Sequence, residues 1–248
     1  MVRAFEDNHQ KAEAKKAIPE KFRVNMHVHS AFSDGQFTPE ALVLQAIKAD
    51  LTVLGITYHY NTRKTLSLKP EMLARYLDEL DRLNTLHGNK LRILKGIEIN
   101  TLEFFLSNHS LPPDKLLERL DFVLFEYVTN IPRAGIPLRH TILISRDIPV
   151  ICGLAHTDLP MAFPEMNPED LVSQLNEAEM FLELNESYRR PGERHPFYDH
   201  YESYLACDQS KLLKLSVGSD NHHQVSGPAS RAIRKILSLN LERNLICL

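Results

Sequence analysis

Residues 26–35 read Met-His-Val-His-Ser-Ala-Phe-Ser-Asp-Gly and stand at the end of the first segment with strand character. Apolar and polar residues alternate from residue 22 to 29, so His27 and His29 are expected to leave the strand on the same side. Asp34 follows in a Ser-Asp-Gly turn that can bring its carboxylate back toward both rings. Zinc, iron and manganese accept such a mixture of imidazole and carboxylate ligands. The stretch therefore predicts a metal site at a strand end.

The same arrangement, a predicted strand followed by a metal-binding type of residue, recurs along the chain. Further strands are predicted over 51–57, 91–100, 122–125, 150–155, 180–185 and 213–218. The residues near their C-terminal ends that can bind metal are His59, Glu98, Glu126, His156, Asp220 and His222. A lone His-x-His pair is usually structural. The recurrence favours one shared site instead.

Predicted helices alternate with these strands. They cover about 41–47, 70–86, 113–120, 138–145, 168–178, 201–211 and 229–237. Such alternation indicates parallel strands with right-handed crossovers, and closure of the sheet gathers the strand C-termini on one face. We expect an α/β fold, a distorted TIM-like (β/α)7 barrel in a single domain over residues 21–248. Residues 1–20 are expected to form an N-terminal extension.

Composition excludes several classes of function. The 248 residues carry 29 basic and 32 acidic side chains and a net charge of −3, so extended nucleic acid is not an expected partner. The three cysteines are widely spaced, as in a protein of a reducing compartment. No apolar segment approaches membrane-spanning length. We expect a soluble, cytoplasmic protein without a membrane partner, and the sequence leaves its oligomeric state open.

The order of the short motifs resembles the PHP (polymerase and histidinol phosphatase) family over about residues 22–230. The motifs are His-x-His, Ser-Asp-Gly, Thr-x-His-x-Asn, Gly-Ile-Glu, Ala-His and Gly-Ser-Asp-x-His. The resemblance implies a barrel that holds two or three divalent ions (Zn, Mn or Fe). It also implies the ligands: His27, His29, Glu98 and Asp220 for the first metal, Asp34, His59 and His222 for the second, and Glu98 with His156 for a third.

Two positions depart from the family pattern. A Ser-Val-His run is usual after the fourth strand, whereas this chain has Glu126-Tyr127-Val128, so Glu126 is the candidate that would replace the imidazole at the third metal. The alternative is a solvated or ion-paired Glu126. Tyr58 stands where the family more often has an aspartate. That aspartate would orient a ligand, and its loss would weaken metal affinity.

Candidate substrate-binding residues lie on the predicted rim loops. Arg189 and Arg190 follow the strand 180–185 and are candidates to meet a phosphate, with a solvated surface role as the equal alternative. Arg63 and His195 are weaker candidates on other parts of the rim. Glu183 is expected to support the site from behind the ligands.

The expected activity is that of a metal-dependent phosphoesterase acting on a small phosphate ester. Hydroxide formed from metal-activated water would attack phosphorus, with His27, His29, Glu98 and Asp220 as the catalytic metal centre. Two alternatives remain open. The same metals can activate water against an amide or a lactone, and the departures at residues 58 and 126–128 are compatible with a catalytically weakened, regulatory metal-binding barrel.

Overall fold

A single parallel sheet forms the centre of the molecule. The computed structural model describes residues 18–60, 62, 70–102, 111–224 and 227–246. The sheet runs in the order β1-β2-β4-β5-β6-β7-β8, with β3 paired to β4. The strands are β1 (Val24–Val28), β2 (Val53–Ile56), β3 (His59–Tyr60), β4 (Arg92–Asn100), β5 (Phe122–Glu126), β6 (Ile151–Leu154), β7 (Phe181–Asn185) and β8 (Leu215–Gly218).

Strand β3 resumes the line of β2 after a two-residue interruption. Ile56 pairs with Lys95 and His59 pairs with Glu98, so the register along β4 is the same on both sides of the break. The expected strand 51–57 is therefore shorter than predicted. The continuation places His59 beside Glu98 on neighbouring strands.

The first and last strands bring the sheet close to a closed barrel. The amides of Ser219 and Asp220 donate to the carbonyl of His27 at 3.3 and 2.8 Å, and the amide of His29 donates to the carbonyl of Asn221 at 3.0 Å. These bonds lie just beyond the end of β8, where Val28 also bridges to Asn221. The predicted fold class, a TIM-like α/β barrel with seven strands in its main path, is confirmed.

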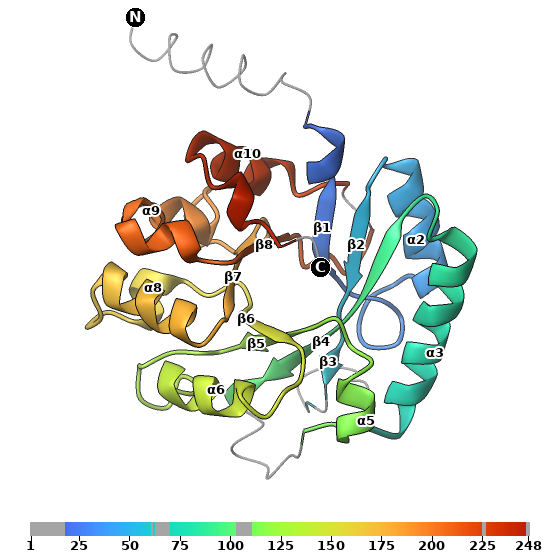
Figure 1. Ribbon diagram of the computed structural model, residues 1–248, viewed down its shortest axis with the longest axis horizontal. Helices are drawn as coiled ribbons and strands as arrows, with labels where there is room; N and C mark the ends of the chain where they lie inside the picture. The colour runs from blue at the N-terminus through green and yellow to red at the C-terminus, as the bar shows by residue number, and fades with distance from the viewer. Residues whose placement is uncertain (1–17, 61, 63–69, 103–110, 225–226, 247–248) are drawn as a thin grey trace, which may run out of the picture.

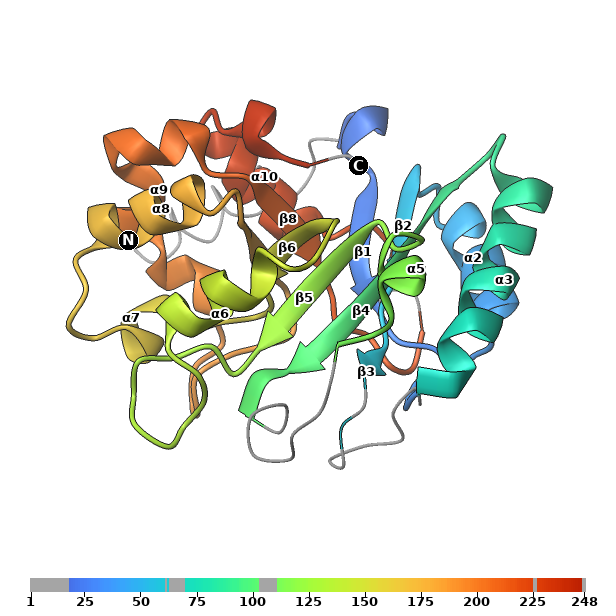
Figure 2. The same ribbon diagram turned by 60° about the horizontal axis from the view of Figure 1, so that its bottom comes forward.

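Helices surround this sheet, as Figure 1 shows, with α2 and α3 on one side and α8, α9 and α10 on the other. The α-helices are α2 (Pro39–Lys48), α3 (Pro70–His87), α5 (Asp114–Leu117), α6 (Leu138–Ser145), α7 (Leu159–Ala162), α8 (Pro168–Glu177), α9 (Glu202–Ala206) and α10 (Ser230–Ser238). The 3-10 helices are η1 (Glu20–Phe22), η2 (Phe197–His200), η3 (Asp208–Leu212) and η4 (Glu242–Asn244). Figure 2 shows the arrows of β1, β4 and β5 pointing toward the end of the sheet where β3 lies.

The prediction of one continuous helix over 201–211 is wrong. Residues 197–212 instead form η2, α9 and η3, and Cys207 interrupts them with an extended backbone (ψ 157°). By contrast, α2 begins as expected, because the Thr38 hydroxyl accepts the amide of Ala41 and Pro39 occupies the first turn. Residues 1–17 lie outside the described part of the chain, so the boundary between an extension and the barrel domain stays a prediction.

The core lies between the sheet and the surrounding helices. Two glycines leave room for aromatic rings there: a Cβ at Gly96 would overlap the ring of Phe122, and one at Gly153 would overlap the ring of Phe181. Across the described residues, none of the helices combines the length and the hydropathy that crossing a membrane requires.

Candidate metal centre

The candidate ligands come together at the C-terminal end of the barrel. His27 lies on β1 and His29 directly follows its last residue, and their Nε2 atoms approach to 3.0 Å. The pairing of β1 with β2 shifts register between Asn25 and Val28, an irregularity of the kind that re-aims side chains. The other candidates come from the ends of the following strands or from the loops after them. The nine side chains fall into three overlapping groups.

The first group consists of His27, His29, Glu98 and Asp220, all of them buried. Nε2 of His29 lies 2.7 Å from Oδ1 of Asp220 and 3.4 Å from Oε2 of Glu98. Nε2 of His27 lies 3.3 Å from the same Asp220 atom and 3.5 Å from the same Glu98 atom. Two imidazole nitrogens and two carboxylate oxygens thus surround one point.

The second group consists of His29, Asp34, His59 and His222. Oδ2 of Asp34 lies 3.2 Å from Nε2 of His222 and 3.5 Å from Nε2 of His59. The ring of His29 stacks on those of His222 and His59, with centroids 4.3 and 4.6 Å apart. The Ser-Asp-Gly turn therefore brings its carboxylate back to the histidines, in the way the spacing indicates.

The third group consists of Glu98, Glu126 and His156. Nε2 of His156 lies 2.9 Å from Oε1 of Glu98, and Oε1 of Glu126 lies 3.7 Å from Nδ1 of His59. Glu126 is buried at the end of β5 rather than solvated. Glu98 belongs to the first and third groups and His29 to the first and second, so the three groups form one continuous cluster.

Buried polar atoms of this cluster fit a metal ion. Nδ1 of His29 and of His59, Oε2 of Glu98 and Oδ1 of Asp220 are inaccessible to solvent and have no hydrogen-bond partner of good geometry among the described residues. Leaving such atoms unsatisfied is costly unless a partner such as a cation is bound. The mixture of nitrogen and oxygen donors suits zinc, manganese or iron.

Protons partly balance the negative charge of the cluster. Burial disfavours the charged form of His27, but nearby carboxylates, first that of Glu183, outweigh burial and raise its pKa. Burial acts likewise on His59, whose pKa rises to about 9 through its hydrogen bond to Asp34 and the neighbouring glutamates. His29 differs, because burial lowers its pKa. The cluster thus holds cationic charge where metal ions would otherwise supply it.

Glu183 on β7 contacts two of the candidate ligands from behind. Its Oε1 lies 2.9 Å from Nδ1 of His27 and accepts a hydrogen bond from the Asn185 amide at 3.0 Å. Its Oε2 accepts the backbone N–H of His156 at 2.9 Å. A carboxylate that binds the outer nitrogen of a histidine orients the ring and leaves the inner nitrogen for a metal.

Of the candidate substrate-binding residues, Arg189 and Arg190 bond to partners outside this cluster. Arg190 forms a two-pronged ion pair with Asp158, at 2.7 and 2.8 Å. Arg189 donates to the carbonyls of Ser187 and Arg194, at 2.7 and 3.2 Å. Asp158 thus holds the Arg190 guanidinium through both of its carboxylate oxygens.

The structure describes His195 but not Arg63. His195 is exposed and contacts Asp199 at 3.1 Å and Arg231 at 2.9 Å. Arg63 lies outside the described residues, so its predicted role is not addressed by the structure. A substrate-binding role for any of the four residues stays a prediction.

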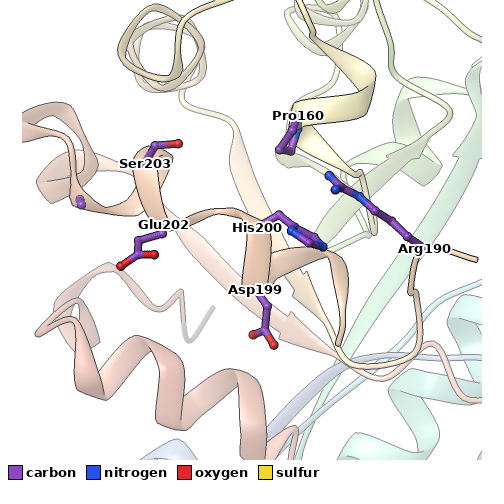
Figure 3. A pocket seen from close by; sticks show the side chains of 7 residues that line it. Pro160, Arg190, Asp199, His200, Glu202 and Ser203 are labelled. Atoms are coloured by element: carbon purple, nitrogen blue, oxygen red, sulfur yellow. The ribbon is translucent and has the colours of Figure 1, made fainter. Parts of the chain in front are cut away.

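A surface hollow of about 610 Å³ lies next to Arg190. Its lining residues are Pro160, Arg190, Asp199, His200, Glu202, Ser203 and Ala206. Figure 3 shows the Arg190 guanidinium and the His200 imidazole directed toward the same space beside Pro160, whereas Asp199 points elsewhere. Arg190 thus borders both this hollow and, through Asp158, the loop that carries His156.

Two tyrosines change the account drawn from the sequence. Tyr58 is fully buried and its hydroxyl bonds to that of Ser30 at 2.7 Å, so it packs in the core beside Tyr76 instead of orienting a ligand. Tyr188 was not predicted as a site residue. Its ring stacks on His156 with 3.9 Å between centroids. No spacing rule singles it out in the sequence, because it follows the strand in an irregular loop.

A family model described as "PHP domain" matches residues 25–235. The chain therefore belongs to the PHP domain family. This membership supports the expected class, a metal-dependent hydrolase of the PHP type. Among curated proteins, the chain is 34% identical over 103 residues to the DNA polymerase/3'-5' exonuclease PolX of Bacillus subtilis (strain 168). The match spans 41% of this chain and only 16% of that protein.

Solved structures share the fold. Histidinol phosphate phosphatase from Lactococcus lactis subsp. lactis Il1403, complexed with zinc, L-histidinol and phosphate, superposes with a TM-score of 0.56 at 19% identity, covering 90% of this chain and 94% of that one. A solved structure described as that of the metal-dependent tyrosine phosphatases YwqE from Bacillus subtilis and CpsB from Streptococcus pneumoniae matches with a TM-score of 0.51 at 18% identity. The match covers 91% of this chain and 96% of that one. At these sequence identities, the likeness shows a shared fold and no more than that.

Proposed function

We propose that this protein is a metal-dependent phosphoesterase that hydrolyses a small phosphate ester. The observation that carries the proposal is the continuous cluster of nine ligand-type side chains, linked through His29 and Glu98. Family membership adds support. Bound divalent ions would lower the pKa of water and stabilise negative charge that develops on a phosphate.

In this proposal the protein's own residues hold and orient the ions. His27, His29, Glu98 and Asp220 would hold the first, and Asp34, His59 and His222 the second, with His29 between them. Glu98, Glu126 and His156 would hold the third. Glu183 would keep the outer nitrogen of His27 occupied, so that its inner nitrogen faces the cluster.

Metal content and turnover of the same preparation test the proposal. The protein is treated with chelator, reloaded with Mn²⁺ or Zn²⁺, analysed for bound metal, and assayed with an aryl phosphate. We expect about two to three ions per chain, because the candidate ligands form three overlapping groups whose donors suit such ions, and hydrolysis only after reloading. Histidinol phosphate and phosphotyrosine are the next substrates to assay, because the similar structures carry those names.

A pair of neighbouring histidines provides the matched control. His222→Ala removes a side chain of the second group, whereas His223→Ala removes an exposed imidazole one residue later. We expect loss of metal and turnover in the first variant and wild-type values in the second. Equal metal content in both variants would contradict the ligand assignment.

A second candidate, hydrolysis of an amide or lactone, is favoured by the engagement of Arg189 and Arg190 with partners other than the cluster. A phosphate site often uses a guanidinium that is free to bind in two-pronged fashion. Metal-loaded protein that cleaves an aryl ester or lactone but no phosphate would select this candidate.

A further inference from the structure

Tyr188 stacks on one of the candidate ligands. Its ring lies nearly parallel to that of His156, at an interplanar angle of 13° and 3.9 Å between centroids. His156 belongs to the third group, and its Nε2 lies 2.9 Å from Oε1 of Glu98, which the first and third groups share. Tyr188 therefore contacts a candidate ligand that lies next to the junction of two groups.

His156 and Asp220 share an unusual backbone conformation. His156 has φ +26° and Asp220 has φ +46°, and among the nine candidate ligands these two alone have positive φ. Residues without a glycine's freedom hold such conformations only when surrounding contacts stabilise them. The backbone of His156 is held by Glu183, and that of Asp220 by the carbonyl of His27. Tyr188 supplies a further contact, to the ring of His156.

The position of Tyr188 is itself fixed by a short hairpin. Its carbonyl accepts the amide of Phe197 at 3.0 Å, and Arg189 bridges antiparallel to Pro196. The hairpin turns near Gly192, whose φ is +81°. Tyr188 therefore stands at the base of an anchored loop, where its side chain has little freedom to leave His156.

We propose that Tyr188 is a positioning residue that fixes the plane of the His156 ring, and so sets the direction from which this imidazole meets Glu98 and the third metal group. The inference rests on the proposed function only in taking these groups as metal sites. Partners of this kind behind ligands commonly change metal affinity by about 10–100-fold.

Direct titration of the chelator-treated protein with Mn²⁺ or Co²⁺ tests the inference. We expect Tyr188→Leu, which removes ring and hydroxyl, to weaken the most loosely bound ion by about tenfold or more. Tyr188→Phe keeps the stack and should recover most of that affinity. The visible absorption of the Co²⁺-loaded protein should shift in Tyr188→Leu, because a reoriented imidazole changes the ligand field.

Phe197→Leu is the matched control. Phe197 packs on Tyr188 within the same hairpin, with ring centroids 6.1 Å apart, and is not one of the candidate ligands. Wild-type affinity in Tyr188→Leu would overturn the inference, as would an equal loss in Phe197→Leu, since general loosening of the loop would then explain both. The titration uses no substrate, so it tests the inference separately from the proposed function. If the protein shows no turnover but Tyr188→Leu still lowers the metal affinity, the phosphoesterase proposal fails and the inference about Tyr188 stands.

Discussion

Oε1 of Glu183 lies 2.9 Å from Nδ1 of His27, and both side chains are almost wholly buried. The contact joins β7 to β1 across the barrel interior, on the side of the imidazole that faces away from the candidate ligands. It fixes which nitrogen of His27 carries a proton when a cation occupies the cluster, because the carboxylate needs a donor at Nδ1.

Substitution of Glu183 should therefore weaken metal binding. We expect Glu183→Gln to lower the affinity for Mn²⁺ or Zn²⁺ by about tenfold or more, since a neutral amide orients His27 less strongly and no longer offers two carboxylate oxygens. Metal titration by calorimetry measures the effect. Glu177→Gln, at an exposed position of α8, should bind metal as the wild type does. Unchanged affinity in Glu183→Gln would show that β7 merely packs behind the site.

Gly218 leaves the space in which Glu183 meets His27. A Cβ at this position would overlap Oε1 of Glu183 and would lie 2.5 Å from Cβ of His27. Gly218→Ala should cost about 1–3 kcal/mol of folding free energy, as overpacked cores do, and should also reduce bound metal. Thermal unfolding of the metal-free protein and elemental analysis measure the two effects. A variant with wild-type values of both would mean that β7 and β8 can separate without disturbing the ligands.

Metal binding should release protons. The pKa of His59 is raised to about 9, because its bond to Asp34 and the nearby glutamates outweigh burial, so the metal-free ring is protonated at pH 7. A cation that binds this ring must displace the proton. Affinity should therefore rise as the pH increases toward 9. Calorimetry in buffers of different ionisation enthalpy measures the released protons, and His59→Gln should reduce their number by about one. Equal release from both proteins would contradict a role for His59.

Arg190 and Arg189 form a matched pair for the predicted substrate contact. Arg190 forms a two-pronged ion pair with Asp158, whereas the Arg189 side chain, among the described residues, bonds to backbone carbonyls of its own loop. If Arg190 binds the phosphate, Arg190→Ala should raise KM by about tenfold, the equivalent of one lost charge-assisted hydrogen bond, with a smaller change in kcat. Arg189→Ala should leave KM near the wild-type value. Equal effects of the two variants would assign both arginines to the loop structure.

Much of the fold was predictable because regular patterns carry it. Buried strands stand out as apolar runs, and α2 is marked by Thr38 and Pro39 at its start. The continuous helix over 201–211 was predicted wrongly, because periodicity does not register the extended backbone of Cys207. The interruption between β2 and β3, just before His59, was not predicted for a similar reason. Strand β3 is defined by its pairing with β4 and not by its local sequence.

The candidate ligands were predictable because they lie at strand ends, where order along the sequence becomes proximity in a barrel. Contacts between loops follow no such rule. The stacking of Tyr188 on His156 and the pair of Arg190 with Asp158 both depend on how two loops fold over the rim, which residue spacing does not specify. The orientation of Tyr58 toward Ser30 was likewise set by packing against neighbours remote in sequence.

The closure between β1 and the end of β8 has a consequence for biosynthesis. Asn25 bonds to Ser219 across 194 positions of sequence, beside the first and last ligands of the cluster. A nascent chain that has not yet released residue 219 from the ribosome lacks Asp220 and His222, so it cannot assemble the complete donor set. Contacts this distant in sequence also form late, because a long loop must close first. Tight binding of a metal ion by the cluster would thus be possible only after the whole barrel has been translated and closed.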